Sequence, residues 1–392
     1  MANSVLKANQ EVIEKLLADA EKVGILAFEE AVEAEKNATF SEKVINAFKE
    51  TEIPKLLLPQ KYGGPQIDFK TYTKIIRAVA KHSISAAWLT YFYPLHNTLL
   101  AFLPEKGREE IIRQGGLVAD VFAPIGKAVR DGEGYRITGT YNFASGVLYA
   151  DWVGLGLMME MSESVGPEFC MFILPKSDVK IVENWNTLGL RATGSNQVIA
   201  DNVFVPFERI VRLTVANTTG RPPEKDYDKD YLFYDLPYFS AFYVGFASIA
   251  LGGAERLLEE FKKRTEKRVR IEGELEKESP RSQRVLAELT TKFYTAEGLM
   301  EKYISMLENY QWDGGVGPEE FFAIRAKIIS IVTEITTKVL TTLGGAAVYK
   351  GDTVEQFTRD LLTVATHKVL LYEDSIDAFG KTLFGFETFT LG

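Results

Sequence analysis

The spacing of apolar residues changes twice along this chain of 392 residues, and these two changes restrict the possible folds more than any other feature. Up to about Gly115, apolar residues recur at helical spacing, as at Val12, Leu16 and Ala20. From Gly116 to about Arg212, short β-rich runs alternate with Gly, Asp, Asn and Pro. Helical spacing then returns. The sequence therefore predicts an α+β fold in which a β domain lies between two helical domains.

Three domains follow from these changes and from a polar stretch after the β-rich part. We expect an N-terminal helical domain over residues 1–115, a central antiparallel β-barrel or sandwich over 116–216, and a linker with a C-terminal four-helix bundle over 217–392. Asp131-Gly132-Glu133-Gly134 is typical of a hairpin turn. The six predicted strands are Leu117 to Phe122, Tyr135 to Phe143, Trp152 to Met158, Phe169 to Leu174, Val179 to Glu183 and Val198 to Val205. The four predicted bundle helices are Pro237 to Glu272, Pro280 to Tyr310, Pro318 to Leu343 and Thr353 to Phe384.

Charge and cysteine content exclude several classes of function. The chain has 45 Lys and Arg against 54 Asp and Glu, so an acidic surface disfavours nucleic acid as a partner. The single cysteine, Cys170, lies in an apolar run, which excludes a disulfide framework and argues against a thiolate metal site. The sequence shows no apolar leader and no uncharged span of membrane length. We therefore expect a cytoplasmic enzyme with no bound metal and no membrane partner.

Several short motifs occur in the same order along the chain. Pro124-Ile125-Gly126-Lys127-Ala128 precedes Phe143-Ala144-Ser145-Gly146, and Trp185-Asn186-Thr187-Leu188-Gly189-Leu190-Arg191-Ala192-Thr193-Gly194-Ser195 follows. Near the end come Gly344-Gly345-Ala346-Ala347 and Gln356-Phe357-Thr358-Arg359-Asp360, with His367 seven residues later. Together with the order of the domains, these motifs resemble the acyl-CoA dehydrogenase superfamily, and specifically its flavin-dependent monooxygenase branch, which includes dibenzothiophene monooxygenase and two-component phenol and hydroxyphenylacetate hydroxylases.

The resemblance implies a flavin enzyme, and the residue at one position indicates which reaction it performs. Acyl-CoA dehydrogenases place a glutamate near the end of the fourth bundle helix to remove a proton from the thioester. Here that position holds Lys368, and a cation cannot act as this base. Glu373 and Asp374, about one turn further on, leave a base of another kind open.

Two histidines match positions of the monooxygenase branch. His367 has the apolar helical neighbours Val364, Leu370 and Leu371, so helical spacing places it on an inward face. A neutral imidazole there can accept a phenolic proton, or donate one to the departing oxygen of a flavin C4a-hydroperoxide. His96 matches a second active-site histidine on the N-terminal helical domain. A core histidine bonded to a carbonyl, and a helix-surface histidine, are the respective structural alternatives.

The remaining site predictions concern the cofactor. In relatives the serine at Ser145 bonds near flavin N5, and we expect Phe143, Gly146, Arg191, Thr193 and Ser195 to line the flavin or substrate pocket, with an ordinary turn as the alternative. Arg268, or Arg270, is the candidate for the flavin phosphate across a subunit boundary, although a solvated ion-paired helix face explains the same charges. The resemblance also implies that Gly344 and Gly345 are among the cofactor-binding residues.

The resemblance leads to one main functional hypothesis and two alternatives. The main hypothesis is a two-component monooxygenase that takes reduced flavin, FAD or FMN, from a separate flavin reductase and uses O2 to oxidise an aromatic or heteroatom-containing small molecule. The alternatives are an acyl-CoA dehydrogenase or oxidase with an atypical base, and a flavin-binding scaffold without turnover. The family also implies a homotetramer formed through the bundle. The sequence does not identify the substrate.

Overall fold

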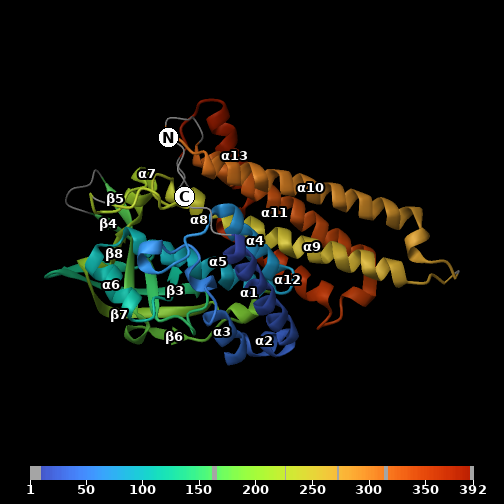
Figure 1. Cartoon of the computed structure of the whole chain (residues 1–392), viewed down its shortest axis with the longest axis horizontal. Coiled ribbons are helices and arrows are strands. Elements are labelled where there is room, and N and C mark those ends of the chain that lie inside the picture. The colour runs from blue at the N-terminus through green and yellow to red at the C-terminus, as the bar shows by residue number, and fades with distance from the viewer. Residues whose placement is uncertain (1–9, 161–165, 226, 272, 313–316, 389–392) are drawn as a thin grey trace.

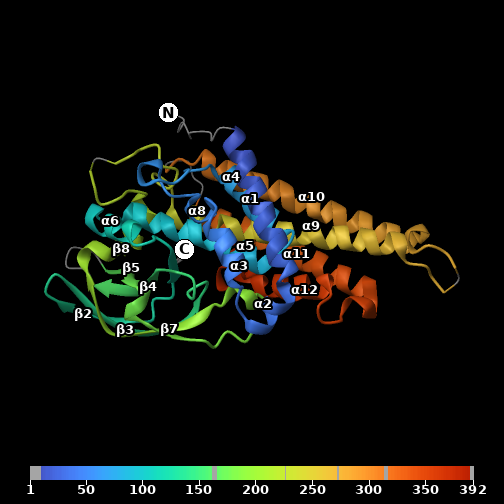
Figure 2. The ribbon, with the colours of Figure 1, turned by 60° about the horizontal axis from the view of Figure 1, so that its bottom comes forward.

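The computed structural model describes residues 10–160, 166–225, 227–271, 273–312 and 317–388, and it has the predicted order of helices, strands and helices. Figures 1 and 2 show the strands at one end of an elongated molecule and the long C-terminal helices extending away from them, with the N-terminal helices packed between. The fold is therefore α+β, as the sequence predicted. The N-terminal helices are α1 (Gln10–Glu29), α2 (Ala31–Asn37), α3 (Glu42–Lys49), α4 (Phe69–Ala80), α5 (Ile84–His96) and α6 (Glu105–Arg113).

The central part is a pair of four-stranded sheets. One sheet has the order β1-β4-β5-β8 and the other the order β2-β3-β7-β6. All neighbours are antiparallel except β1 and β4, which run parallel with Val118 opposite Trp152. The predicted hairpin is present, since Asp131 pairs with Gly134 across the two-residue turn between β2 and β3. The strands are β1 (Val118–Val121), β2 (Lys127–Asp131), β3 (Gly134–Ala144), β4 (Trp152–Glu160), β5 (Pro167–Pro175), β6 (Lys180–Val182), β7 (Asn196–Pro206) and β8 (Ile210–Arg212).

The C-terminal part contains the expected bundle, but two of its four predicted helices are interrupted. The first is split at Tyr243, and the fourth stops at Ala365 and resumes only at Tyr372 after the 3-10 helix η9 (Lys368–Leu370). The prediction of one continuous helix from Thr353 to Phe384 was therefore wrong. The elements are α7 (Leu213–Thr219), α8 (Tyr238–Phe242), α9 (Val244–Lys267), α10 (Pro280–Glu308), α11 (Pro318–Leu343), α12 (Thr353–Ala365) and α13 (Tyr372–Leu383).

Helix α5 connects the three parts. It begins at an N-cap, where the Ser83 side chain accepts a hydrogen bond from Ala86 N, and twelve of its thirteen residues are buried. Such all-round burial is typical of a central helix. It contacts β1, the 3-10 helix η5 (Arg191–Thr193), α9 and α12. Side chains on α5 are therefore placed to face both the sheets and the bundle.

One part of the bundle is unusually apolar. By length and composition alone the stretch Tyr238–Lys267 could cross a membrane, which differs from the expectation drawn from the sequence. Within this stretch, 83% of the qualifying window is buried inside the protein. Its apolar composition is therefore accounted for by its position as a core helix against α4, α10 and α11.

Candidate active site

Ser145 lies in the turn that follows β3 and joins a chain of buried polar side chains. Its hydroxyl accepts a hydrogen bond from Trp88 Nε1 at 2.9 Å and lies 2.8 Å from Ser195 Oγ, which is 2.7 Å from Thr193 Oγ. All three hydroxyl-bearing residues are buried. The adjacent Gly146 has a positive φ of 71°, and its N–H donates to the carbonyl of Thr193. The structure thus brings together four residues that the sequence predicted separately: Ser145, Gly146, Thr193 and Ser195.

This polar chain continues through the backbone of Leu190 to a buried carboxyl group. The Leu190 carbonyl accepts from Thr193 Oγ and from Trp185 Nε1, both at 2.8 Å, while its N–H donates to Asp360 Oδ1 at 2.7 Å. Asp360 lies on α12 and is only 1% exposed. Burial, with a smaller contribution from Glu35, raises the pKa of Asp360 to about 7. Asp360 therefore fixes the loop that positions the hydroxyl groups around Ser145.

His367 lies in the connection between α12 and η9, not on a continuous helix as predicted. Its ring centroid is 4.7 Å from that of Phe246 and 6.1 Å from that of Trp88, so the imidazole reaches the same aromatic cluster as Ser145. The Nδ1 atom is buried and has no hydrogen-bond partner in the described part of the chain. Burial, with a smaller effect of the nearby Arg325 cation, lowers the pKa of His367 to about 4. The imidazole is thus neutral at pH 7 and can accept a proton from a bound molecule.

The acidic residues that could replace the missing base do not lie beside this imidazole. Glu373 and Asp374 are exposed in the first turn of α13, which packs on α11. Lys368, at the position where acyl-CoA dehydrogenases carry the glutamate, is also exposed. The interruption of the fourth helix therefore moves both carboxylates to the outside of the bundle.

His96 is the last residue of α5, and both of its ring nitrogens face protein atoms. Nδ1 lies 3.0 Å from the carbonyl oxygen of Val118, so it must carry the proton for this hydrogen bond, and Nε2 lies 2.9 Å from Asp120 Oδ1. Burial raises the pKa of Asp120, and the contact with His96 partly offsets this shift. His96 packs against Phe92, with 5.0 Å between the ring centroids, and Phe92 in turn contacts Phe246. In this arrangement His96 is part of the wall of the aromatic cluster and is paired with a carboxyl group.

The predicted flavin-lining residues differ in how freely their side chains face solvent. Phe143 is 67% exposed and has a positive φ of 71°, a strained conformation for a bulky residue. Its ring lies edge-on to the ring of Trp185. Leu188, three residues after Trp185, is also exposed. Arg191, in contrast, donates to the Glu35 and Thr187 carbonyl oxygens and to Asn186 Oδ1. Its guanidinium connects two loops, and its predicted contact with flavin stays a prediction.

The predicted phosphate-binding residues lie together but far from Ser145 along the bundle. Arg268 caps the C-terminus of α9, and its Nη1 donates to the carbonyl of Leu343 at 3.4 Å. Gly344 and Gly345 follow directly in the 3-10 helix η8 (Gly344–Ala347). The connection between α9 and α10 lies at the end of the molecule remote from the strands (Figure 1). Within one chain these three residues are thus not brought to the Ser145 cluster. Arg270, the other candidate, is bonded to Glu276.

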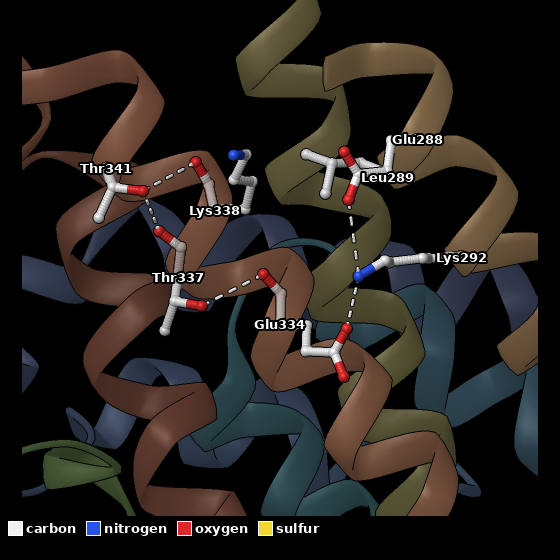
Figure 3. Close-up of a pocket in the computed structure, with 7 residues that line it drawn as sticks. All are labelled: Glu288, Leu289, Lys292, Glu334, Thr337, Lys338 and Thr341. Carbon is white, nitrogen blue, oxygen red and sulfur yellow. Dashed lines mark hydrogen bonds and ion pairs between the residues drawn. The ribbon is translucent and has the colours of Figure 1, made fainter. Parts of the chain in front are cut away.

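A groove on the outer face of the bundle contains none of the predicted residues. Figure 3 shows it between α10 and α11, where Lys292 lies between Glu288 and Glu334. Among the residues that the structure describes, no group of three or more His, Cys, Asp or Glu side chains is placed to hold a metal ion. Burial raises the pKa of Cys170 to about 12, which keeps this core thiol protonated. Neither the groove nor the thiol offers the chemistry of the Ser145 and His367 region.

Four residues of this region were missed by sequence reasoning as site residues. Trp88, Asp120, Arg325 and Asp360 each contact or influence a predicted residue from another element. Asp360 alone stood within a recognised motif. The other three lie in helical or β-rich segments whose patterns indicate burial but give no sign of a polar role.

Comparisons with known proteins identify a family model and several relatives similar to this chain. A family model described as "Acyl-CoA dehydrogenase, C-terminal domain" matches residues 244–372. The oxygenase subunit HsaA of a flavin-dependent monooxygenase from Rhodococcus jostii is 30% identical over 197 residues, which span 50% of this chain and only about half (51%) of that protein. The oxygenase component of p-hydroxyphenylacetate 3-hydroxylase from Acinetobacter baumannii is 24% identical and covers 98% of this chain and 90% of its own length. Indole-3-acetate monooxygenase from the same species is 24% identical over 86% of both chains.

Solved structures show the same fold over nearly the whole chain. XiaF from Streptomyces, in complex with FADH2 and glycerol, has a TM-score of 0.86 at 22% identity and covers 97% of each chain. TdsC from Paenibacillus, in complex with FMN and indole, has a TM-score of 0.78 at 18% identity and covers 95% of this chain and 98% of its own. At these identities the likeness concerns the fold alone.

Proposed function

Because the chain belongs to the acyl-CoA dehydrogenase superfamily and is an oxygenase component of the flavin-dependent monooxygenase class, we propose that it hydroxylates or otherwise oxygenates a small aromatic molecule with reduced flavin and O2. The observation that supports this reaction most strongly is the neutral imidazole of His367. Its buried Nδ1 has no hydrogen-bond partner among the described residues, and the adjacent position, at which a dehydrogenase carries its carboxylate base, holds Lys368. The site is therefore suited to proton exchange with a phenol and not to proton removal from a thioester.

The residues around Ser145 fit a planar, partly polar ring. Phe143 and Leu188 offer exposed apolar surface, while the Ser145 hydroxyl, fixed by Trp88 and Ser195, offers one polar atom beside it. Reduced flavin, when bound, would supply two electrons to O2, so that one oxygen atom passes to the substrate and the other leaves as water. In this proposal Ser145 holds the ring by a hydrogen bond, and the aromatic cluster of Trp88 and Phe246 excludes water from the reacting atoms.

His367 acts as the proton-exchanging group in this proposal. Its neutral ring accepts the phenolic proton at Nδ1 and thereby increases the electron density of the aromatic ring that is attacked. His96 has its two ring nitrogens beside Val118 O and Asp120 Oδ1, so in this proposal it shapes the pocket wall. This assignment gives the two histidines different roles.

The cofactor and the partners are proposed from the relatives and from the separation of the site residues. One related structure holds FADH2 and another FMN, and the relatives are named as oxygenase subunits or components, which implies a separate flavin reductase. Arg268, Gly344 and Gly345 lie at the opposite end of the bundle from the strands. We propose that they receive the phosphate part of a flavin bound by a neighbouring subunit of a homotetramer.

Rapid mixing tests the function directly. The protein is loaded with reduced FMN or FAD without oxygen and then mixed with oxygenated buffer. A long-lived absorbing species that is neither reduced nor oxidised flavin is expected, because burial of the site slows its decay. Prompt reoxidation without such a species would refute the proposal. Bleaching of oxidised flavin by an acyl-CoA would instead support the dehydrogenase alternative.

Substitution of Ser145 separates catalysis from folding. Ser145→Ala removes the acceptor of Trp88 Nε1 and is expected to shorten the lifetime of the absorbing species and divert oxygen to hydrogen peroxide. Ser177→Ala, at an exposed position of a 3-10 helix, is the matched control and should behave as the unmodified chain. Product yield, peroxide yield and thermal stability are measured for both. Equal peroxide yields for the two variants would remove Ser145 from the proposed mechanism.

A further inference from the structure

Arg325, on α11, is a buried cation without a partner of opposite charge. It is 1% exposed, and its Nη2 donates to the carbonyl oxygen of Val369 at 2.6 Å. The rings of Tyr243 and Phe322 cover its guanidinium, each with 4.8 Å from Cζ to the centroid. Among the residues that the structure describes, no carboxylate forms an ion pair with it, and its Nε and Nη1 lack hydrogen-bond acceptors. Buried charges are costly unless they are paired, so this arrangement requires an explanation.

The neighbouring titratable groups do not supply the missing negative charge. Burial raises the pKa of both Tyr303 and Tyr243, that of Tyr303 to about 12, although the charge of Arg325 opposes both shifts and a side-chain hydrogen bond between Arg325 and Tyr303 also opposes the shift at Tyr303. Both phenols are therefore neutral at pH 7. The third neighbour, His367, is neutral and would only add positive charge if protonated. The backbone carbonyl of Ser240 accepts a hydrogen bond from Tyr303, whereas its buried hydroxyl has no partner among the residues described. Unpaired polar groups thus gather around the guanidinium, a pattern found where a polar molecule binds.

A series of aromatic rings connects Arg325 to the candidate active site. Tyr243, which covers the guanidinium, stacks on Phe246 with 6.1 Å between centroids, and Phe246 contacts His367 at 4.7 Å. Trp88, which bonds Ser145, contacts both Phe246 at 5.4 Å and His367 at 6.1 Å. The ring contacts therefore run from Arg325 through Tyr243 and Phe246 to Trp88 and Ser145, with His367 beside Phe246 and Trp88.

We propose that Arg325 binds the carboxylate of an aromatic acid, so that the substrate of this enzyme is a small aromatic acid whose ring lies along Tyr243 and Phe246 toward His367. The rings of Tyr243 and Phe322 cover the faces of the guanidinium and leave the in-plane N–H groups of Nε and Nη1, at which carboxylates bind. The inference rests on the proposed function, since it names the substrate class of that site. The same guanidinium, through Val369, also holds the segment that follows His367, so substrate binding and imidazole position are connected.

Binding of matched ligand pairs tests this inference without any turnover. The full chain, free of flavin and then with reduced FMN under anaerobic conditions, is titrated calorimetrically with p-hydroxyphenylacetate and indole-3-acetate and with the uncharged amide of each acid. At least one acid should bind about tenfold or more tightly than its amide. Arg325→Met should weaken that acid by roughly 10- to 100-fold and the amide by less than about threefold, because only the acid loses a charge-assisted bond. Arg325→Lys keeps the charge but loses the planar fork, so it should give an intermediate loss.

The control and the outcomes follow from the same titrations. Arg108→Met removes another buried arginine, which covers Tyr62 and is paired with Glu224, and it should leave the preference for acid unchanged. Equal affinity of the unmodified chain for acids and amides, or equal weakening of both by Arg325→Met, would overturn the inference. If Arg325→Met does not fold, the affinities of the unmodified chain and of Arg325→Lys for the acids and their amides still test the inference. Because no oxygen is involved, a protein that prefers acids yet fails the rapid-mixing test would refute only the proposed oxygenation.

Discussion

Replacement of Asp360 by asparagine should change how the stability of the protein depends on pH. Asp360 is 1% exposed, and its Oδ1 accepts the Leu190 N–H at 2.7 Å. Glu35 on α2 and Arg359 and Glu355 on α12 are the charged groups around it. Burial first, and Glu35 second, raise the pKa of Asp360 to about 7. Asparagine keeps an oxygen acceptor for Leu190 but binds no proton in this range.

The sign and size of the effect follow from proton linkage. In the unfolded chain the carboxyl pKa is about 3.9. Between about pH 4 and pH 7 the folded chain therefore holds a proton that the unfolded chain has lost, and the free energy of unfolding falls as the pH rises. Three pKa units at about 1.4 kcal/mol each give an upper limit of about 4 kcal/mol. The unmodified chain should thus lose up to this amount relative to Asp360→Asn across this window, with no further change above it.

Unfolding in urea or by heat, measured in small pH steps from 5 to 8 for both proteins, provides the assay. Asp178→Asn, at an exposed position of a surface 3-10 helix, is the control whose curve should run parallel to that of the unmodified chain. The free energy of unfolding of the unmodified chain minus that of Asp360→Asn must fall with rising pH and level off near pH 7. Parallel curves for these two proteins would refute the reasoning, because they would mean that Asp360 titrates alike in the folded and unfolded chains.

Three further predictions concern other parts of the site. Burial lowers the pKa of His367 to about 4, so the free energy of unfolding should fall by at most about 3 kcal/mol as the pH drops from about 6.5 to 4. His367→Ala should lack this loss in the same unfolding assay, and an unchanged pH dependence in this variant would contradict the prediction. A side chain at Gly189 would meet the carbonyl oxygen of Arg359 at 2.4 Å, so Gly189→Ala should lower the melting temperature, whereas Gly298→Ala on open helix surface should raise it slightly; the opposite order would show that this loop is not tightly packed. Arg268→Ala should weaken binding of reduced FAD and of reduced FMN about tenfold in anaerobic titrations, because both flavins carry the phosphate that Arg268 is proposed to contact, and unchanged affinity for both would exclude the arginine from the phosphate site.

The order of the domains was predictable because periodicity reports burial directly. The two strands that were missed show where this relation fails. Lys127–Asp131 (β2) is largely exposed and lacks an alternating pattern, and Ile210–Arg212 (β8) is only three residues long. Both are identified only by their hydrogen bonds to a neighbouring strand.

The interruption of the fourth bundle helix was not predictable from local sequence. Residues 366–371 contain no glycine or proline, and the apolar spacing continues through Val369 and Leu370. A contact distant in sequence accompanies the break, since Arg325 on α11 binds the carbonyl of Val369 and takes it out of the helical hydrogen-bond pattern. His367 was thus identified through the spacing of motifs, whereas its conformation depends on α11.

Residues of the candidate site were predictable only where they belong to a recognised sequence motif. Ser145, Thr193 and Ser195 lie in recognised segments, and the structure joins them. Asp120 and Arg325 stand in segments whose only local signal is burial. Their roles depend on which side chains other elements bring near them, and a single sequence does not contain that information.

The break after α12 also makes the position of the His367 imidazole independent of the position of α13, which a continuous helix would have coupled. The imidazole at residue 367 is fixed by its own loop and by α11, while α13 presents Leu383 and Phe384 to the outside of the subunit. Changes in α13 can therefore remodel this exposed apolar surface without rotating the imidazole ring. A chain built in this way can alter that surface and its chemistry independently in the course of evolution.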